Sequence, residues 1–134
     1  MAPKDLKIKR EDRSAVEDYL KKAADNYDQM LSAIRSDNYN AAGTLALQCA
    51  ISSADAVCVF EKGVRSISQD HLDLCDLVDS LPLGEAKEKG RSLRKVIAKK
   101  NLIQYERRNI HQSEALEVVK IVARFYQWVR EQVR

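Results

Sequence analysis

At 134 residues, the chain is long enough for one domain with a single apolar core and too short for two independent cores. Apolar residues make up 45% of the chain and charged residues 32%, which excludes an intrinsically disordered protein. The longest apolar runs are a few residues, so the sequence predicts no membrane span, and no secretory signal is visible at the N-terminus. We therefore expect a cytoplasmic protein with no membrane partner.

Positive charge is concentrated late in the chain. Residues 87–108 contain nine basic side chains and two acidic ones, so this segment carries +7, while the whole chain carries +3 and the remainder therefore −4. This asymmetry favours an anionic partner on one face, although a solvated helix surface explains many such runs equally well. The basic residues are Lys87, Lys89, Arg91, Arg94, Lys95, Lys99, Lys100, Arg107 and Arg108.

The three cysteines, Cys49, Cys58 and Cys75, form no CxxC pair and have no histidine at zinc-ligand spacing. Cys49 and Cys58 are nine residues apart on one predicted helix, on opposite faces, so they cannot form a disulfide with each other. We expect all three to be small buried apolar residues. The sequence also has no Gly-rich phosphate loop or other common catalytic motif, so we predict no metal and no cofactor.

The chain is expected to be all-helical, because it has only four glycines and two prolines and no sustained apolar–polar alternation. Residues 1–12 are polar and are predicted to be a flexible segment that precedes a single domain over 13–134. Apolar residues from Val16 to Ile34 recur at spacings of three and four, which predicts the first helix. Ser36 and Asp37 supply the turn that follows.

A second helix is predicted over residues 38–62, with Gly63 as its C-cap. Its interior is rich in alanine, serine and glycine, which let neighbouring helices approach closely, so we expect it at the centre of the bundle. The carboxylate of Asp55 on this helix needs water or polar partners, because burying it without them is costly. We expect it on the exposed flank, and the alternative is a polar pocket.

Three further helices complete the predicted fold, an all-α, antiparallel up-and-down bundle of about five helices. Ser68 is the predicted N-cap of the third, and His71 in its first turn is expected to cap the helix or lie on the surface. The fourth spans residues 85–100 and Ser113 opens the fifth. Spacing of four places one basic stripe on the fourth helix, made of Lys87, Arg91, Lys95 and Lys99.

Polar residues crowd the predicted junction of the last two helices, in the segment "KKNLIQYERRNIH" (residues 99–111). Together with "YNAAGTLALQCAISSADAVCVFEKG", "QDHLDLCDLV" and the C-terminal "IHQSEALEVVKIVARFYQWV", it resembles the HEPN superfamily over nearly the whole chain. Members of that family are small helical bundles found in prokaryotic toxin–antitoxin and nucleotidyltransferase-associated proteins. The resemblance implies the same bundle here.

The resemblance also implies a site. Active members place an arginine and a polar residue a few positions before a histidine, and two chains of a homodimer together form a metal-independent ribonuclease site. This chain keeps the spacing as Lys100, Asn101 and Tyr105 but changes both chemical residues. Lysine loses the bidentate guanidinium fork, and tyrosine, with an ordinary pKa of about 10, is a poor general base. The motif is therefore degenerate, and we expect no efficient catalysis.

Three functions follow as hypotheses. In the first, Lys100, Asn101 and Tyr105 line a basic cleft that binds RNA or a nucleotide, with Arg107, Arg108 and His111 meeting phosphate. The chain would then form a homodimer, with a nucleotidyltransferase-like antitoxin as its natural partner. In the second, the same cleft is an active endoribonuclease toxin. In the third, the protein is a purely structural or protein-interaction subunit.

Overall fold

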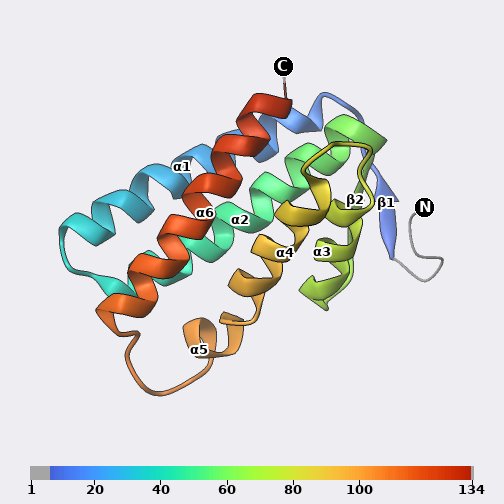
Figure 1. Ribbon diagram of the computed structural model, residues 1–134. Coiled ribbons are helices and arrows are strands. Elements are labelled where there is room, and N and C mark those ends of the chain that lie inside the picture. The colour runs from blue at the N-terminus through green and yellow to red at the C-terminus, as the bar shows by residue number, and fades with distance from the viewer. Residues whose placement is uncertain (1–6, 134) are drawn as a thin grey trace.

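The computed structural model describes residues 7–133 and is a helical bundle (Figure 1). Its elements are β1 (Ile8–Arg10), α1 (Ala15–Arg35), α2 (Tyr39–Lys62), β2 (Val64–Ser66), α3 (His71–Asp79), α4 (Ala86–Ile97), α5 (Lys100–Gln104) and α6 (Gln112–Gln132). The all-α bundle predicted from the sequence is confirmed, with α5 as an additional short helix.

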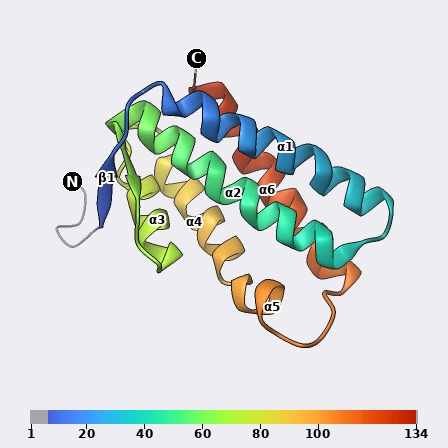
Figure 2. The ribbon, with the colours of Figure 1, turned by 180° about the vertical axis from the view of Figure 1, so that it is seen from behind.

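Helix α2 lies at the centre of the bundle. It contacts all five other helices, with α1 and α6 packed along it on one side and the α3–α4 pair on the other (Figures 1 and 2). Its small side chains, among them Ala46, Ala50 and Ala54, are fully buried, as their close approach to neighbouring helices requires. Gly63 ends the helix in the left-handed conformation with φ of 66°, which confirms its prediction as the C-cap.

By length and composition α2 could also cross a membrane, which the sequence analysis did not expect of any segment. Most of its apolar residues are buried inside the bundle, as in the core helix of a soluble protein. Cys49 and Cys58 on this helix are buried and free, as is Cys75, which confirms the prediction for the cysteines. Burial raises the pKa of the Cys49 and Cys75 thiols to about 12, so both remain protonated.

The N-terminal segment differs from its prediction. Residues 1–6 of the predicted flexible segment lie outside the described residues, but Ile8–Arg10 forms a strand that pairs antiparallel with Val64–Ser66. Lys9 lies opposite Arg65 in this ribbon. Strands of three residues are too short to show alternation, so the sequence pattern could not reveal them.

The fourth helix was predicted over residues 85–100, and the predicted C-terminal end is wrong. Helix α4 ends at Ile97, and the backbone N–H of Lys99 bonds to the Val96 carbonyl, three residues back instead of four. A straight continuation would carry Leu102 away from the face that buries Val96 and Ile97. The break lets α5 turn Leu102 into the core.

Two predicted helix starts are also wrong. Asp70, not Ser68, caps α3, because its carboxylate accepts the Leu72 N–H at 3.0 Å, while the Ser68 hydroxyl donates to Asp73 at 2.6 Å. Helix α6 begins at Gln112 after His111, not at Ser113. Its first turn is closed by Glu114, whose Oε1 accepts the His111 N–H at 2.9 Å.

Candidate functional site

Helix α5 and the N-terminal end of α3 form a pocket of about 370 Å³. Lys100 and Asn101 contribute from the first turn of α5, and His71 contributes from the first turn of α3. These two helices are far apart in sequence and are brought together by packing on α2. The full lining is Gln69, Asp70, His71, Leu72, Ile97, Ala98, Lys100 and Asn101.

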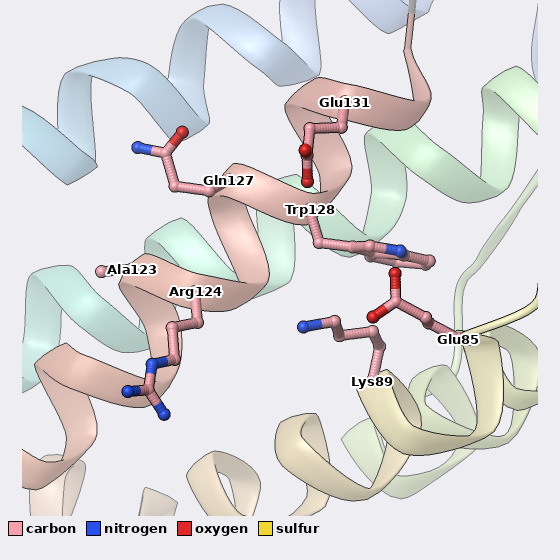
Figure 3. A pocket seen from close by; sticks show the side chains of 7 residues that line it. All are labelled: Glu85, Lys89, Ala123, Arg124, Gln127, Trp128 and Glu131. Atoms are coloured by element: carbon pink, nitrogen blue, oxygen red, sulfur yellow. The ribbon is translucent and has the colours of Figure 1, made fainter.

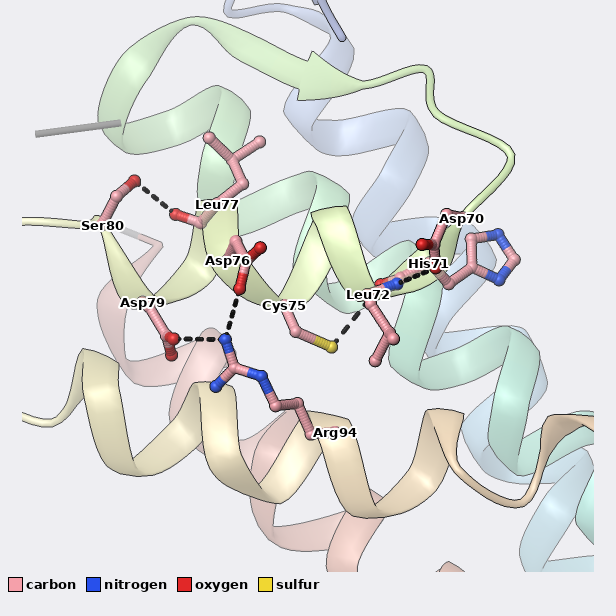
Figure 4. A network of polar contacts seen from close by, with 9 residues as sticks. All are labelled: Asp70, His71, Leu72, Cys75, Asp76, Leu77, Asp79, Ser80 and Arg94. Carbon is pink, nitrogen blue, oxygen red and sulfur yellow. Dashed lines mark hydrogen bonds and ion pairs between the residues drawn. The ribbon is translucent and has the colours of Figure 1, made fainter. Parts of the chain in front are cut away.

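His71 lies in the first turn of its helix, as predicted, but it lines this pocket and does not cap the helix. It begins α3, but the capping carboxylate belongs to Asp70, and the His71 Nδ1 atom is buried with no hydrogen-bond partner within the described range (Figure 4). Burial lowers the pKa of the imidazole, and the positive charge of Lys100 lowers it further. The ring is therefore neutral at pH 7, beside a cation. Nothing in the local sequence could have signalled this pairing.

Tyr105, the third residue of the degenerate motif, does not join Lys100 and Asn101 in the pocket. It follows α5 as its C-cap and is 72% exposed. The turn at Tyr105 and Glu106 is closed by their backbone N–H groups, which both donate to the Asn101 carbonyl at 2.9 Å. Within one chain, the retained spacing therefore does not produce a shared cleft.

The remaining predicted phosphate-binding residues differ in their freedom to act. Arg108 is held by Glu114 through two hydrogen bonds, of 2.9 Å and 2.7 Å. The hydrogen bond from Arg108 and that from the His111 backbone hold the pKa of Glu114 at about 2. His111 caps α6, and its imidazole remains exposed. Arg107 is exposed and makes no ion pair with any residue from 7 to 133.

The segment from Tyr105 to His111 is tied to the start of α2 by Asn40. The Asn40 Oδ1 accepts the Ile110 N–H at 2.8 Å, and its Nδ2 donates to Asn109 at 3.0 Å. The Ile110 side chain packs against Gly43 of α2. A Cβ atom added to Gly43 would lie only 2.7 Å from Ile110 Cδ1. The position of the loop after α5 therefore depends on the N-terminal turns of α2.

Basic residues of α4 divide into two groups. Arg94 points to α3, where its Nη2 bonds to Asp76 at 2.5 Å and to Asp79 at 2.6 Å (Figure 4). It clamps the two helices together. Lys87, Arg91 and Lys95 are exposed on the predicted stripe, while Lys99, its fourth predicted member, follows the end of α4 and is half-buried.

A second polar pocket, of about 200 Å³, lies on the other side of His71. Asp55 reaches it from α2 and is only 8% exposed, so its predicted exposed position is wrong and the polar-pocket alternative is correct. Arg65 reaches it from β2, and its Nη1 donates to the Tyr19 hydroxyl at 3.1 Å. The full lining is Ile51, Asp55, Arg65, Ser66, Ile67, Ser68, His71 and Leu74.

A third pocket, of about 340 Å³, lies between α4 and α6 (Figure 3). Glu85, the N-cap residue of α4, extends toward the indole of Trp128, and Lys89 lines the pocket from the first turns of α4. Arg124 and Glu131 line the side formed by α6. Acidic and basic side chains alternate around it, so this pocket has no preference for an anionic ligand. The anion-binding site predicted from the sequence is therefore not placed in this pocket.

The fold and the pockets define a class of protein: a small helical bundle whose polar site lies where a short helix meets the ends of longer ones. A family model described as the HEPN domain matches residues 16–132, and the chain therefore belongs to the HEPN domain family. This confirms the family predicted from the sequence. Comparison with curated proteins and with solved structures finds no match.

Proposed function

We propose that this HEPN protein binds single-stranded RNA or a nucleotide in the pocket between α3 and α5. The observation that carries the proposal is that Lys100 and Asn101 line one pocket with His71. A lysine offers a charge to phosphate, and the asparagine amide and the imidazole offer hydrogen bonds to ribose and base. The exposed basic residues of α4 would provide further phosphate contacts for a longer RNA.

Binding without efficient cleavage fits the residues of the degenerate motif. Lys100 supplies positive charge without the guanidinium fork that braces a developing phosphorane. Tyr105 lies outside the pocket and is exposed, where it could stack on a base or contact a second chain. We further propose a cytoplasmic homodimer with a nucleotidyltransferase-like antitoxin as partner. A strict monomer in sedimentation at high concentration would exclude the dimer.

Lys100→Ala is expected to weaken binding of a fluorescent single-stranded RNA at least about tenfold at low salt, because it removes the lysine charge that lines the pocket. Each lost phosphate contact should also reduce the slope of log affinity against log salt by about 0.7. Fluorescence anisotropy at several salt concentrations measures both quantities.

The matched control is Lys21→Ala, which removes the same charge from α1, where Lys21 forms an ion pair with exposed Asp25. This variant should bind RNA almost as the parent does. Equal losses in the two variants would mean that binding follows overall charge and not the pocket. If the parent binds neither RNA in a salt-dependent manner nor a nucleotide, the proposal fails, and the third hypothesis, a structural or protein-interaction subunit, is favoured.

The neutral imidazole of His71 beside Lys100 favours one alternative function, a metal-independent endoribonuclease. His71 could accept the 2′-hydroxyl proton, and Lys100 could stabilise the charge that develops on phosphate. In this alternative, a chelator leaves cleavage of single-stranded RNA intact and His71→Gln abolishes it. Cleavage that is lost in Tyr105→Phe and retained in His71→Gln would instead assign the chemistry to Tyr105. An intact RNA after prolonged incubation excludes the alternative.

A further inference from the structure

The Asp55 pocket contains three polar groups whose hydrogen-bonding capacity the fold does not use. Asp55 is only 8% exposed, and its carboxylate accepts no hydrogen bond from residues 7–133. The Nε of Arg65 and the Nδ1 of His71 are buried and likewise have no hydrogen-bond partner in that range. Because buried polar groups in proteins are normally paired, two buried, unpaired nitrogen atoms on residues that line one cavity with the Asp55 carboxylate indicate a ligand.

The shape of the pocket limits the size of that ligand. A volume of about 200 Å³ lies below the range of about 300–1,000 Å³ that holds a complete drug-sized molecule. Apolar side chains, Ile51, Ile67 and Leu74, form part of the wall beside the polar groups. An apolar wall with a few convergent polar groups suits one planar heterocycle that is read along its edge.

His71 connects this pocket to the one proposed to bind phosphate. Its side chain lines both cavities, and the charge of Lys100 acts on its imidazole. A nucleotide can therefore place its base beside Asp55 and its phosphate beside Lys100, with the ribose at His71. This arrangement rests on the proposed function and adds to it the identity of the base.

Among the four RNA bases, only guanine presents two adjacent donors on its Watson–Crick edge, N1–H and N2–H, to match a carboxylate. Adenine and cytosine offer one amino donor next to a ring acceptor, which a carboxylate repels, and uracil offers a single donor between two acceptors. Guanine also has the acceptors O6 and N7 for the guanidinium group of Arg65, which lines the same pocket. We propose that the Asp55 pocket is a guanine-binding site, which makes this protein selective for guanine nucleotides or for a guanine within single-stranded RNA.

Isothermal titration with the four nucleoside monophosphates tests this assignment on the whole chain. Guanosine monophosphate is expected to bind at least about tenfold more tightly than adenosine monophosphate, because each matched edge discriminates strongly against the wrong base. Asp55→Asn should remove this preference. The substitution exchanges one carboxylate acceptor for an amide donor, and this pair of groups matches the N1–H donor and O2 acceptor of xanthine. The variant should therefore gain affinity for xanthosine monophosphate and lose affinity for the guanine nucleotide.

A gain for xanthine cannot come from misfolding, so it separates a specific role of Asp55 from a structural one. Asp28→Asn, which alters an exposed carboxylate on α1, serves as the control and should leave all affinities unchanged. Equal affinity for the guanine and adenine nucleotides, or an unchanged preference in Asp55→Asn, overturns the assignment.

Failure of the guanine assignment can be distinguished from failure of the proposed RNA binding. A guanine-free RNA that binds in a salt-dependent manner and is released by Lys100→Ala supports RNA binding even when the guanine preference is absent. Tight binding of the guanine nucleotide without any RNA binding would support the base pocket alone.

Discussion

Gly90→Ala is expected to lower the free energy of unfolding by about 1–3 kcal/mol, the usual effect of forcing an extra carbon into a packed contact. A Cβ atom at this position on α4 would overlap the Asp79 Oδ1 atom and lie 2.7 Å from Asp79 Cγ and 3.3 Å from the Cys75 carbonyl. The Asp79 carboxylate cannot move freely, because its other oxygen accepts from Arg94 at 2.6 Å. The better helix propensity of alanine, about 1 kcal/mol, only partly offsets this clash.

Urea unfolding followed by circular dichroism measures the change. Gly84→Ala is the matched control: nothing lies within 4 Å of the added carbon, so its effect should stay within about 0.5 kcal/mol. In the double variant with Asp79→Ala, the obstructing carboxylate is gone and Gly90→Ala should cost much less. An additive double variant would show that Asp79 is not the obstacle.

Asp55→Asn is expected to stabilise the protein by up to about 3 kcal/mol at pH 8 and to lose this effect near pH 4. Burial raises the pKa of Asp55 from its ordinary 3.8 to about 6, despite the opposing effect of the Arg65 charge. The folded state thus holds this proton more tightly than the unfolded state. Stability from this group is fully present below about pH 4 and is lost as pH rises through about 6.

Other charged groups around Asp55 require that the variant be compared with its parent at each pH. Arg65, Glu11 and Lys22 also act on its carboxylate, and His71 lines the same pocket. The lowered pKa of His71 has the opposite sign: it reduces stability as pH falls below about 6.5. Asp28→Asn, on the exposed face of α1, should give a difference of less than about 0.5 kcal/mol throughout. A difference for Asp55→Asn that does not change with pH would contradict the raised pKa.

The sequence pattern was sufficient for the elements with long apolar stripes. The stripe from Val16 to Ile34 became α1, and the small residues of 38–62 became the central helix, because helical periodicity over many residues is hard to mistake. The β1–β2 ribbon and the break before α5 were missed. Both involve only a few residues and depend on partners that the chain brings together only on folding.

The candidate site was predictable in part. The segment 99–111 pointed to Lys100 and Asn101, which do line a pocket, while their pairing with His71 depends on how α3 and α5 pack on α2. Asp55 was assigned to the surface because a carboxylate in a central helix is costly to bury. The cavity beside it is formed by β2 and the start of α3, which helix periodicity cannot reveal.

The central position of α2 has a consequence for how the protein opens. Because α2 touches every other helix, its backbone amides should exchange with solvent only when the whole molecule unfolds. Helix α5 has five residues and buries only Leu102, so its amides should exchange through local openings. The segment that bears the family motif therefore lies on the part of the chain that can rearrange on contact with a partner while the bundle stays folded.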